Sequence, residues 1–393
     1  MTEVRHGLEG VVAFETQIAE PDKEGSALRY RGVDIEELAG RVPFEKVWGL
    51  LVDGSYEPGL PPAEPYNIAI HTGDVRADVQ ASVAMLAPML GMGQTYDISD
   101  EQARLDLSRV AVMVLSYAAQ AARGLGKPVV PQRVVDEGHS LAERFLIRWR
   151  GEPDPQHVRA VDAYWSSAAE HGMNASTFTA RVITSTGADV AAAMSGAIGA
   201  MSGPLHGGAP SRVLGMIQEV ERRGDAAPYV KELLDRGERL MGFGHRVYRA
   251  GGPPSPGAAT HGPGARRAAL RRRRGAGAGG APRVPARRPD RVLETNVEFL
   301  GGHRAGLAEV PASMFTSMFT CARTAGWSAH ILEQKRTGRL IRPSAVYAGP
   351  PARSASSVGG WDAAWAADPP HAADRPARLG AGDRRPPAPW SWS

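Results

Sequence analysis

The chain has 393 residues, 42% of them hydrophobic, and a formal net charge of +4. This length exceeds what one compact core usually holds, so we expect two domains or one domain with a large insertion. The composition excludes a chain that is disordered throughout, and no apolar run is long enough to span a bilayer.

The predicted elements begin with one short strand over residues 11–16 and continue with helices. Apolar residues recur at every third or fourth position in segments 35–39, 44–51, 105–118, 190–201, 210–223, 228–236 and 313–335. The fold class is therefore predicted to be all-α.

Small residues crowd the helix predicted over residues 190–201, where alanine, glycine and serine surround Val190, Met194, Ile198 and Met201. Such side chains let two helices approach closely. This segment therefore indicates a tightly packed core or a subunit interface.

The start of the chain and its one cysteine bear on the cellular compartment. The opening residues, MTEVRHGLEG, lack the apolar stretch of a secretory signal, so we expect a cytoplasmic protein. Cys321 cannot form an internal disulfide and falls within a helical pattern. A reduced thiol in the core is the expected state.

Glycine, proline, alanine and arginine dominate residues 250–287, and a similar composition returns near Gly349 and continues to the end. Such segments are usually linkers or disordered tails. An alternative hypothesis is that a GC-rich gene is read out of frame there, because GC-rich codons encode these amino acids. A regular pattern resumes at Arg288, which would need compensating frame shifts. Nucleic-acid binding through the arginines is disfavoured, since no aromatic residues are interleaved for stacking on bases.

The strongest motif is Gly-Pro-Leu-His-Gly-Gly-Ala-Pro at residues 203–210, between two predicted helices. Glycines beside His206 permit unusual backbone angles and close approach of a substrate. Pro210 suits the first turn of the next helix, whose partial positive charge disfavours an imidazolium. A neutral histidine can donate a hydrogen bond to a carbonyl and stabilise an enolate. A helix-capping histidine is the alternative.

Two weaker motifs follow. Residues 241–249 read Met-Gly-Phe-Gly-His-Arg-Val-Tyr-Arg, in which glycines leave room for a flat ring or a phosphate and arginines suit phosphate oxygens. Residues 296–299 read Asn-Val-Glu-Phe, in which apolar neighbours would raise the pKa of a carboxylate towards that of a useful base. Taken singly, each is more often an ordinary turn or a solvated surface group.

Together, GPLHGGA, GFGHRVYR and NVEF resemble the citrate synthase family, as do GLEGVVAFET and LRYRGVDIEELA near the start. The resemblance covers residues 7–249, 288–299 and 309–347, including FTCARTAGWSAHILEQKRTGRLIRP. It implies a condensing enzyme that joins the acetyl group of acetyl-CoA to oxaloacetate, without a metal or a redox cofactor.

The resemblance also implies a role for each motif. His206 would bind the acetyl carbonyl as it becomes an enol, and Glu298 would remove the methyl proton. His245 would polarise the ketone of oxaloacetate and protonate the alkoxide, after which water hydrolyses the citryl thioester. Gly242 and Gly244 would line the CoA site, with Arg249 placed for a CoA phosphate.

Oxaloacetate is a dianion, so its pocket needs several cationic or hydrogen-bonding groups. The resemblance assigns this role to His171 in EHGMN, Arg323 in CARTAG and Arg342 in LIRP. Arg342 would reach across from the partner subunit of a homodimer. On composition alone, Arg323 is more often a helix-face arginine and Arg342 more often a loop arginine exposed to water.

The sequence departs from the family pattern at three places. Glu298 stands where the family usually has aspartate, and Pro254 stands where an arginine would bind a substrate carboxylate. Residues 300–307 read LGGHRAGL where an apolar helix is expected. These departures put the activity in doubt.

The resemblance implies a large domain from residues 1–210 and 313–350, a small closing domain from residues 211–312, and a disordered tail from 351–393. A 2-methylcitrate synthase that uses propionyl-CoA is one alternative. A catalytically impaired paralogue that acts only as a dimeric binding scaffold is another. Neither nucleic acid nor membrane is an expected partner.

Overall fold

The computed structural model describes residues 4–8, 10–21, 28–207, 219–220, 222–236 and 309–361. The chain divides into two compact units, Gly10–Arg342 and a unit made of Met1–Glu9 and Pro343–Ser393. The described parts of the second unit hold two short 3-10 helices, η1 (His6–Leu8) and η3 (Ala355–Ser357).

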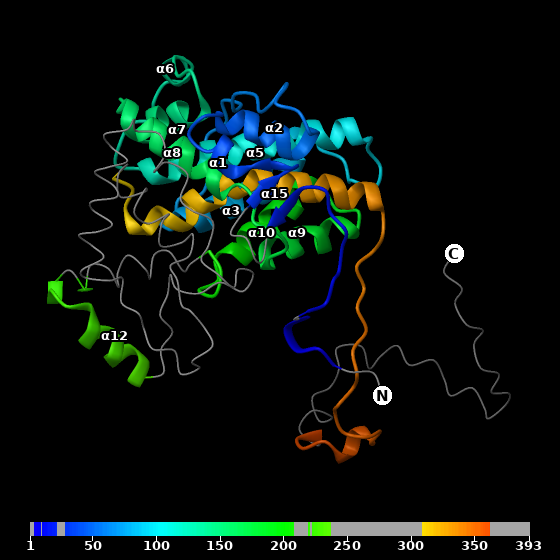
Figure 1. Ribbon diagram of the computed structural model, residues 1–393. Coiled ribbons are helices and arrows are strands. Elements are labelled where there is room, and N and C mark those ends of the chain that lie inside the picture. Colours follow the sequence, from blue (N-terminus) through cyan, green and yellow to red (C-terminus); the bar gives the residue numbers. More distant parts are fainter. Residues whose placement is uncertain are drawn as a thin grey trace. The chain divides into compact units, whose positions relative to one another are not determined.

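The first unit is mostly helical, which confirms the all-α fold class (Figure 1). Its helices are α1 (Ile35–Leu38), α2 (Phe44–Asp53), α3 (Val75–Ala84), α4 (Leu86–Leu90), α5 (Asp100–Arg123), α6 (Gln132–Val135), α7 (Leu141–Arg150), α8 (Pro155–Ala168), α9 (Ala175–Ser185), α10 (Val190–Met201), α12 (Ala226–Asp235), the 3-10 helix η2 (Ala312–Met314) and α15 (Phe315–Thr337). The helices predicted from periodicity are confirmed, except the one over residues 210–223, which lies largely outside the described residues.

A small antiparallel sheet joins β1 (Ala19–Pro21), β2 (Leu28–Tyr30) and β3 (Val33–Asp34) in that order. The strand predicted over residues 11–16 was wrong, because this segment takes no strand conformation. Val11 and Val12 are both exposed, so the segment lacks the alternation of a strand with one buried face. Phe14 packs instead on Phe178 of α9.

Helix α15 runs through the middle of the first unit (Figure 1), where it packs on α2, α5, α8, α9 and α10. Its side chains from Phe315 to Leu332 are almost all buried, around the whole circumference. A helix buried on every side can carry polar groups only where they find partners inside the protein. The bonded polar residues of α15 therefore identify polar contacts inside the core. No helix in the part of the chain described is long and apolar enough to cross a membrane.

The small residues of α10 let it approach two other helices closely. A Cβ atom on Gly196 would lie 2.1 Å from Ile183 Cδ1 on α9, and one on Gly199 would lie 2.7 Å from Gln80 Nε2 on α3. The predicted tight packing at this segment is therefore confirmed as core packing. Cys321 is a free, fully buried thiol, as expected, and burial raises its pKa.

Helix α2 receives its N-terminal cap from another helix. Pro43 precedes α2 and supplies no side-chain cap. Asp162 of α8 accepts a hydrogen bond from the backbone N–H of Phe44 at 3.0 Å. Burial, together with the nearby carboxylate of Glu45, raises the pKa of Asp162 to about 7, against the lowering effect of the Phe44 N–H.

Asp162→Asn should flatten the dependence of stability on pH. An unfolded aspartate titrates near pH 3.9, so between about pH 4 and 7 folded Asp162 keeps a proton that the unfolded chain has lost. Stability from this group therefore falls as pH rises through that window, by at most about 1.4 kcal/mol per pH unit. Asparagine keeps an acceptor for the Phe44 N–H but cannot ionise.

The measurement is the free energy of unfolding in denaturant at pH 5, 6 and 7. Asp154→Asn is the matched control, since it makes the same change at an exposed position that caps the start of α8. Parallel curves for wild type and Asp162→Asn would contradict a partly buried cap that keeps its proton.

Candidate active site

The start of α9 is fixed by Asn174. Its Oδ1 accepts from the N–H of Thr177 at 3.1 Å, and its Nδ2 donates to the Gly172 carbonyl at 3.0 Å. Asparagine is a favoured N-cap because its side-chain oxygen satisfies an otherwise unpaired helix N–H. This cap places Ser176, which is fully buried, in the first turn of α9.

His206 lies in the turn that follows α10. Its backbone N–H donates to the Gly203 carbonyl at 2.9 Å, and Thr316 of α15 donates to the carbonyl of Gly207 at 3.2 Å. A Cβ on Gly207 would lie 2.6 Å from the Met201 carbonyl oxygen, so this position requires glycine. Gly207 thus allows the turn to approach Met201 closely, whereas the predicted close approach of a substrate stays a prediction, and Gly208 lies outside the described residues.

The Ser176 hydroxyl connects His206 to α15. Its Oγ lies 2.7 Å from His206 Nε2 and 2.8 Å from Asn174 Oδ1, and it accepts from Trp327 Nε1 at 3.2 Å. The hydroxyl has one proton, which it can give either to Asn174 or to His206. When it donates to His206, the ring proton lies on Nδ1, where it can be offered to a ligand.

His206 is neutral at pH 7. Burial, and then the positive charge of Arg323, lower its pKa to about 4. The sequence predicted a neutral ring from the helix beginning at Pro210, which lies outside the described residues. The described structure supplies two other causes for the same state, namely desolvation and a nearby guanidinium.

Arg323 packs against Phe319, the ring that His206 also contacts. It is 4% exposed, its Nε donates to the Ala168 carbonyl at 2.7 Å, and its guanidinium carbon lies 4.6 Å from the centre of the Phe319 ring. The His206 ring meets Phe319 edge-on, with centroids 6.4 Å apart. Phe319 therefore contacts both groups and positions them relative to each other.

His171 is 9% exposed and lies in the segment just after α8. It directly follows Glu170, whose pKa is lowered in part by the charge of Arg323. The structure thus collects three of the predicted site residues, His171, Arg323 and His206, in one region between the end of α8, the start of α9 and the middle of α15. Sequence reasoning missed Ser176, Phe319 and Trp327. The spacing of four between Phe319, Arg323 and Trp327 is the signal that places them on one face of a helix.

Arg342 lies elsewhere in this chain. It is exposed, and its neighbour Ile341 donates a hydrogen bond to Ser185 Oγ at 3.1 Å. Ser185 and Ser176 lie at opposite ends of α9, roughly 14 Å apart along the helix axis. Within one chain, Arg342 does not lie near His206. Its contribution to the oxaloacetate pocket of a partner subunit stays a prediction.

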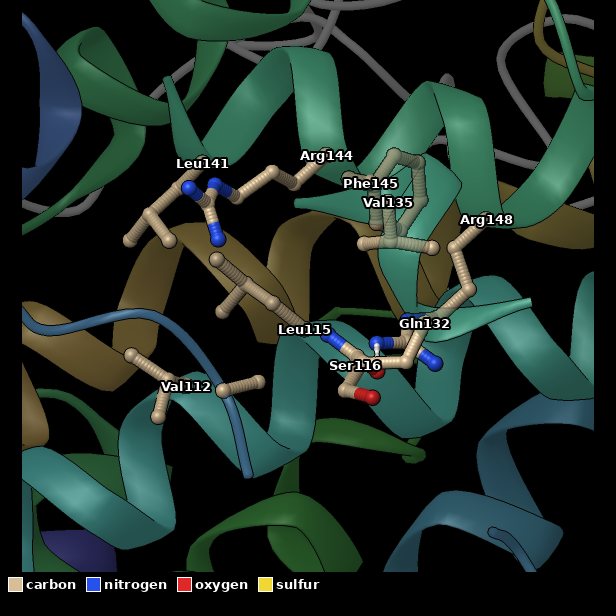
Figure 2. A pocket seen from close by; sticks show the side chains of 10 residues that line it. Val112, Leu115, Ser116, Gln132, Val135, Leu141, Arg144, Phe145 and Arg148 are labelled. Carbon is tan, nitrogen blue, oxygen red and sulfur yellow. Dashed lines mark hydrogen bonds between the residues drawn. The ribbon is translucent and has the colours of Figure 1, made fainter. Parts of the chain in front are cut away.

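The remaining predicted residues, His245, Glu298, Gly242, Gly244 and Arg249, lie outside the described residues, as does Pro254. A pocket between α5, α6 and α7 holds none of the predicted site residues (Figure 2). Its polar lining includes Arg148, which is 5% exposed and donates to Gln132 Oε1 at 2.8 Å.

Comparisons with known proteins point in one direction. Residues 7–344 match the family described as "Citrate synthase, C-terminal domain". The chain is 62% identical to "Putative citrate synthase 2" of Mycobacterium tuberculosis (strain ATCC 25618 / H37Rv) over 371 residues, 91% of this chain and 96% of the relative. It is 31% identical to "2-methylcitrate synthase 2" of Corynebacterium glutamicum over 396 residues, 91% and 98% of the two chains.

Solved structures agree on the fold. The citrate synthase of Pyrobaculum aerophilum matches with a TM-score of 0.67 and 28% identity, covering 89% of this chain and 94% of that one. A Thermoplasma acidophilum citrate synthase in ternary complex with carboxymethyl coenzyme A and oxaloacetate matches with a TM-score of 0.69 and 23% identity, covering 90% and 98%.

Arg323→Gln should raise the pKa of His206 from about 4, because it removes one of the two causes of the lowered value. The pKa should stay below the ordinary 6.5, since burial remains. Titration of ¹⁵N-labelled histidine by NMR measures it, with the His206 signal identified by its loss in His206→Asn.

Arg148→Gln is the matched control, because it removes an equally buried arginine from a pocket that holds no predicted site residue. Equal His206 pKa values in wild type and Arg323→Gln would contradict the electrostatic link.

Proposed function

The chain belongs to the citrate synthase family, and from that premise we propose that it condenses acetyl-CoA with oxaloacetate and releases citrate and CoA. Members of the family are acyltransferases that use acetyl-CoA as a substrate and need no cofactor. The observation that carries the proposal is a neutral His206, held by Ser176 next to the buried Arg323.

His206 supports enolate formation in this proposal. In the tautomer whose Nε2 accepts from the Ser176 hydroxyl, the neutral imidazole offers its Nδ1–H to the thioester carbonyl. That hydrogen bond strengthens as the methyl proton leaves and negative charge develops on the carbonyl oxygen. Ser176 and Trp327 fix the ring before the substrate arrives, so little reorganisation is needed during the reaction.

Arg323 and His171 bind the dianionic oxaloacetate. Arg323 is already oriented by the Ala168 carbonyl and the Phe319 ring, so binding a carboxylate costs little further side-chain entropy. Its burial strengthens a charge-assisted hydrogen bond to that carboxylate. Arg342 of the partner subunit completes the pocket in a homodimer.

In this proposal residues 211–312 form the small closing domain and supply the groups for proton removal, condensation and CoA binding. The Glu298 carboxylate takes a proton from the acetyl methyl group, and the resulting enol carbon attacks the ketone carbon of oxaloacetate. His245 gives a proton to the ketone oxygen as it becomes an alkoxide. Water then cleaves the thioester C–S bond, and CoA leaves as the thiol. Gly242, Gly244 and Arg249 hold CoA.

A second candidate function is the synthesis of 2-methylcitrate from propionyl-CoA. The relative named 2-methylcitrate synthase 2 is matched over 98% of its length, at 31% identity. The two reactions share the chemistry at His206 and Arg323 and differ in the room left for one methyl group. The ratio of kcat/KM for acetyl-CoA and propionyl-CoA decides between them.

His206→Ala should lower kcat by about 10²-fold to 10³-fold, as expected when a donor to a developing oxyanion is lost. A thiol-release assay with acetyl-CoA and oxaloacetate measures the rate. His139→Ala, at an exposed histidine of the same chain, is the control and should leave the rate unchanged. A fully active His206→Ala would overturn the assignment. A folded wild-type protein that releases no thiol would support the binding-only scaffold instead.

A further inference from the structure

A second polar cluster, which no predicted site residue belongs to, is buried between α9 and α15. Glu170, Arg181, His330 and Gln334 are each at most 2% exposed, and Glu333 closes the outer end with its side chain 19% exposed. They come from the segment just after α8, from α9 and from the last turns of α15. Burying a charge costs free energy unless an opposite charge or hydrogen bonds compensate it, so a buried cluster of this kind indicates a specific structural or functional role.

Arg181 organises the outer half of this cluster. Its Nη1 donates to Glu333 Oε2 at 2.7 Å and to His330 Nδ1 at 2.9 Å, and its Nε donates to Gln334 Oε1 at 3.1 Å. Because His330 Nδ1 accepts, the ring proton lies on Nε2. Nε2 lies 3.5 Å from Glu170 Oε1, so the N–H is available to this carboxylate.

Glu170 forms the inner end of the cluster and lies next to the candidate site. The Tyr30 hydroxyl bonds its backbone, accepting from the N–H at 3.2 Å and donating to the carbonyl at 3.1 Å. Its side chain lies against Gly326, where a Cβ would be 2.0 Å from Oε2. Gly326 is three residues after Arg323 on α15, so the carboxylate lies about one helical turn from the guanidinium-bearing residue.

The Glu170 carboxylate is ionised. Burial alone would raise its pKa, but His330 and then Arg323 lower it below its ordinary value. Neither carboxylate oxygen has a hydrogen bond of good geometry within the described residues. A fully buried anion of this kind contributes mainly through its charge, which acts on Arg323.

We propose that Glu170 is a positioning residue for the oxaloacetate pocket. Its buried negative charge, oriented by His330 and Arg181, holds Arg323 in place, while its backbone, fixed by Tyr30, holds the adjoining His171. This inference rests on the proposed function, because it concerns the two groups assigned to the dicarboxylate. Glu333 also accepts from Thr16 Oγ1 at 3.2 Å and Gln17 N–H at 3.1 Å, so the cluster ties the N-terminal segment to the same site.

Glu170→Gln keeps the shape of the side chain and removes its charge. It should raise the KM and the calorimetric Kd of oxaloacetate by at least about tenfold, while kcat and the KM of acetyl-CoA change by less than about threefold. Glu170→Asp keeps the charge and should recover part of the loss. Asp106→Asn, which neutralises an equally buried carboxyl on α5, is the control and should leave all four values unchanged.

A second pair of variants tests the orientation by His330. His330→Gln retains an acceptor for Arg181 and a donor for Glu170, whereas His330→Leu retains neither. The leucine variant should show the loss of oxaloacetate affinity, and the glutamine variant should largely escape it. These two variants test the positioning role of Glu170 if Glu170→Gln does not fold.

A readout that does not require turnover separates this inference from the proposed function. Arg323 lowers the pKa of His206, so a displaced Arg323 in Glu170→Gln should raise that pKa towards the value in Arg323→Gln. Simple loss of a negative charge would lower it instead. A wild-type protein that releases no CoA would defeat the proposed function, while this titration would still decide the role of Glu170. A folded Glu170→Gln with unchanged oxaloacetate affinity and no rise in the His206 pKa would overturn the inference.

Discussion

The hydrogen bond between Ser176 and His206 joins three parts of the chain that are far apart in sequence. Ser176 belongs to the first turn of α9, His206 to the turn after α10, and Trp327, which donates to the same hydroxyl, to α15. The bond forms only if the Asn174 cap starts α9 at the right residue and if glycine at position 207 lets the turn approach Met201. Local backbone rules thus determine where the reactive ring lies and that Nε2 is the nitrogen bonded to Ser176.

Helix α15 supplies the other side of this arrangement. Thr316, Phe319, Arg323 and Trp327 follow one another along it and contact the His206 turn, its ring, the end of α8 and Ser176 respectively. Since α15 is buried on nearly all sides, these polar side chains take their hydrogen-bond partners from inside the protein. The result is a row of side chains in which burial and the nearby guanidinium of Arg323 keep the His206 imidazole neutral.

Much of this could be predicted from the sequence, and the reasons for the misses are physical. Periodicity gave the helices because most have one apolar face, and the histidine motif gave His206 because glycines surround it. The strand predicted over residues 11–16 is absent, because the two valines there are exposed and Phe14 packs on Phe178 of α9. The roles of Glu170 and His330 depend on partners more than a hundred residues away, so no local pattern could reveal them. The low pKa of His206 was expected, but its cause, burial beside Arg323, appears only in three dimensions.

The most direct test is a crystal structure of the protein with oxaloacetate and carboxymethyl-CoA. Our account predicts that the dicarboxylate contacts Arg323 and His171, and that His206 keeps Nε2 on Ser176 while Nδ1 faces the carbonyl-equivalent oxygen of the CoA analogue. It also predicts that Arg342 enters this pocket from the partner subunit. Ligands bound away from Arg323 and His206, or a His206 ring turned away from Ser176, would contradict it.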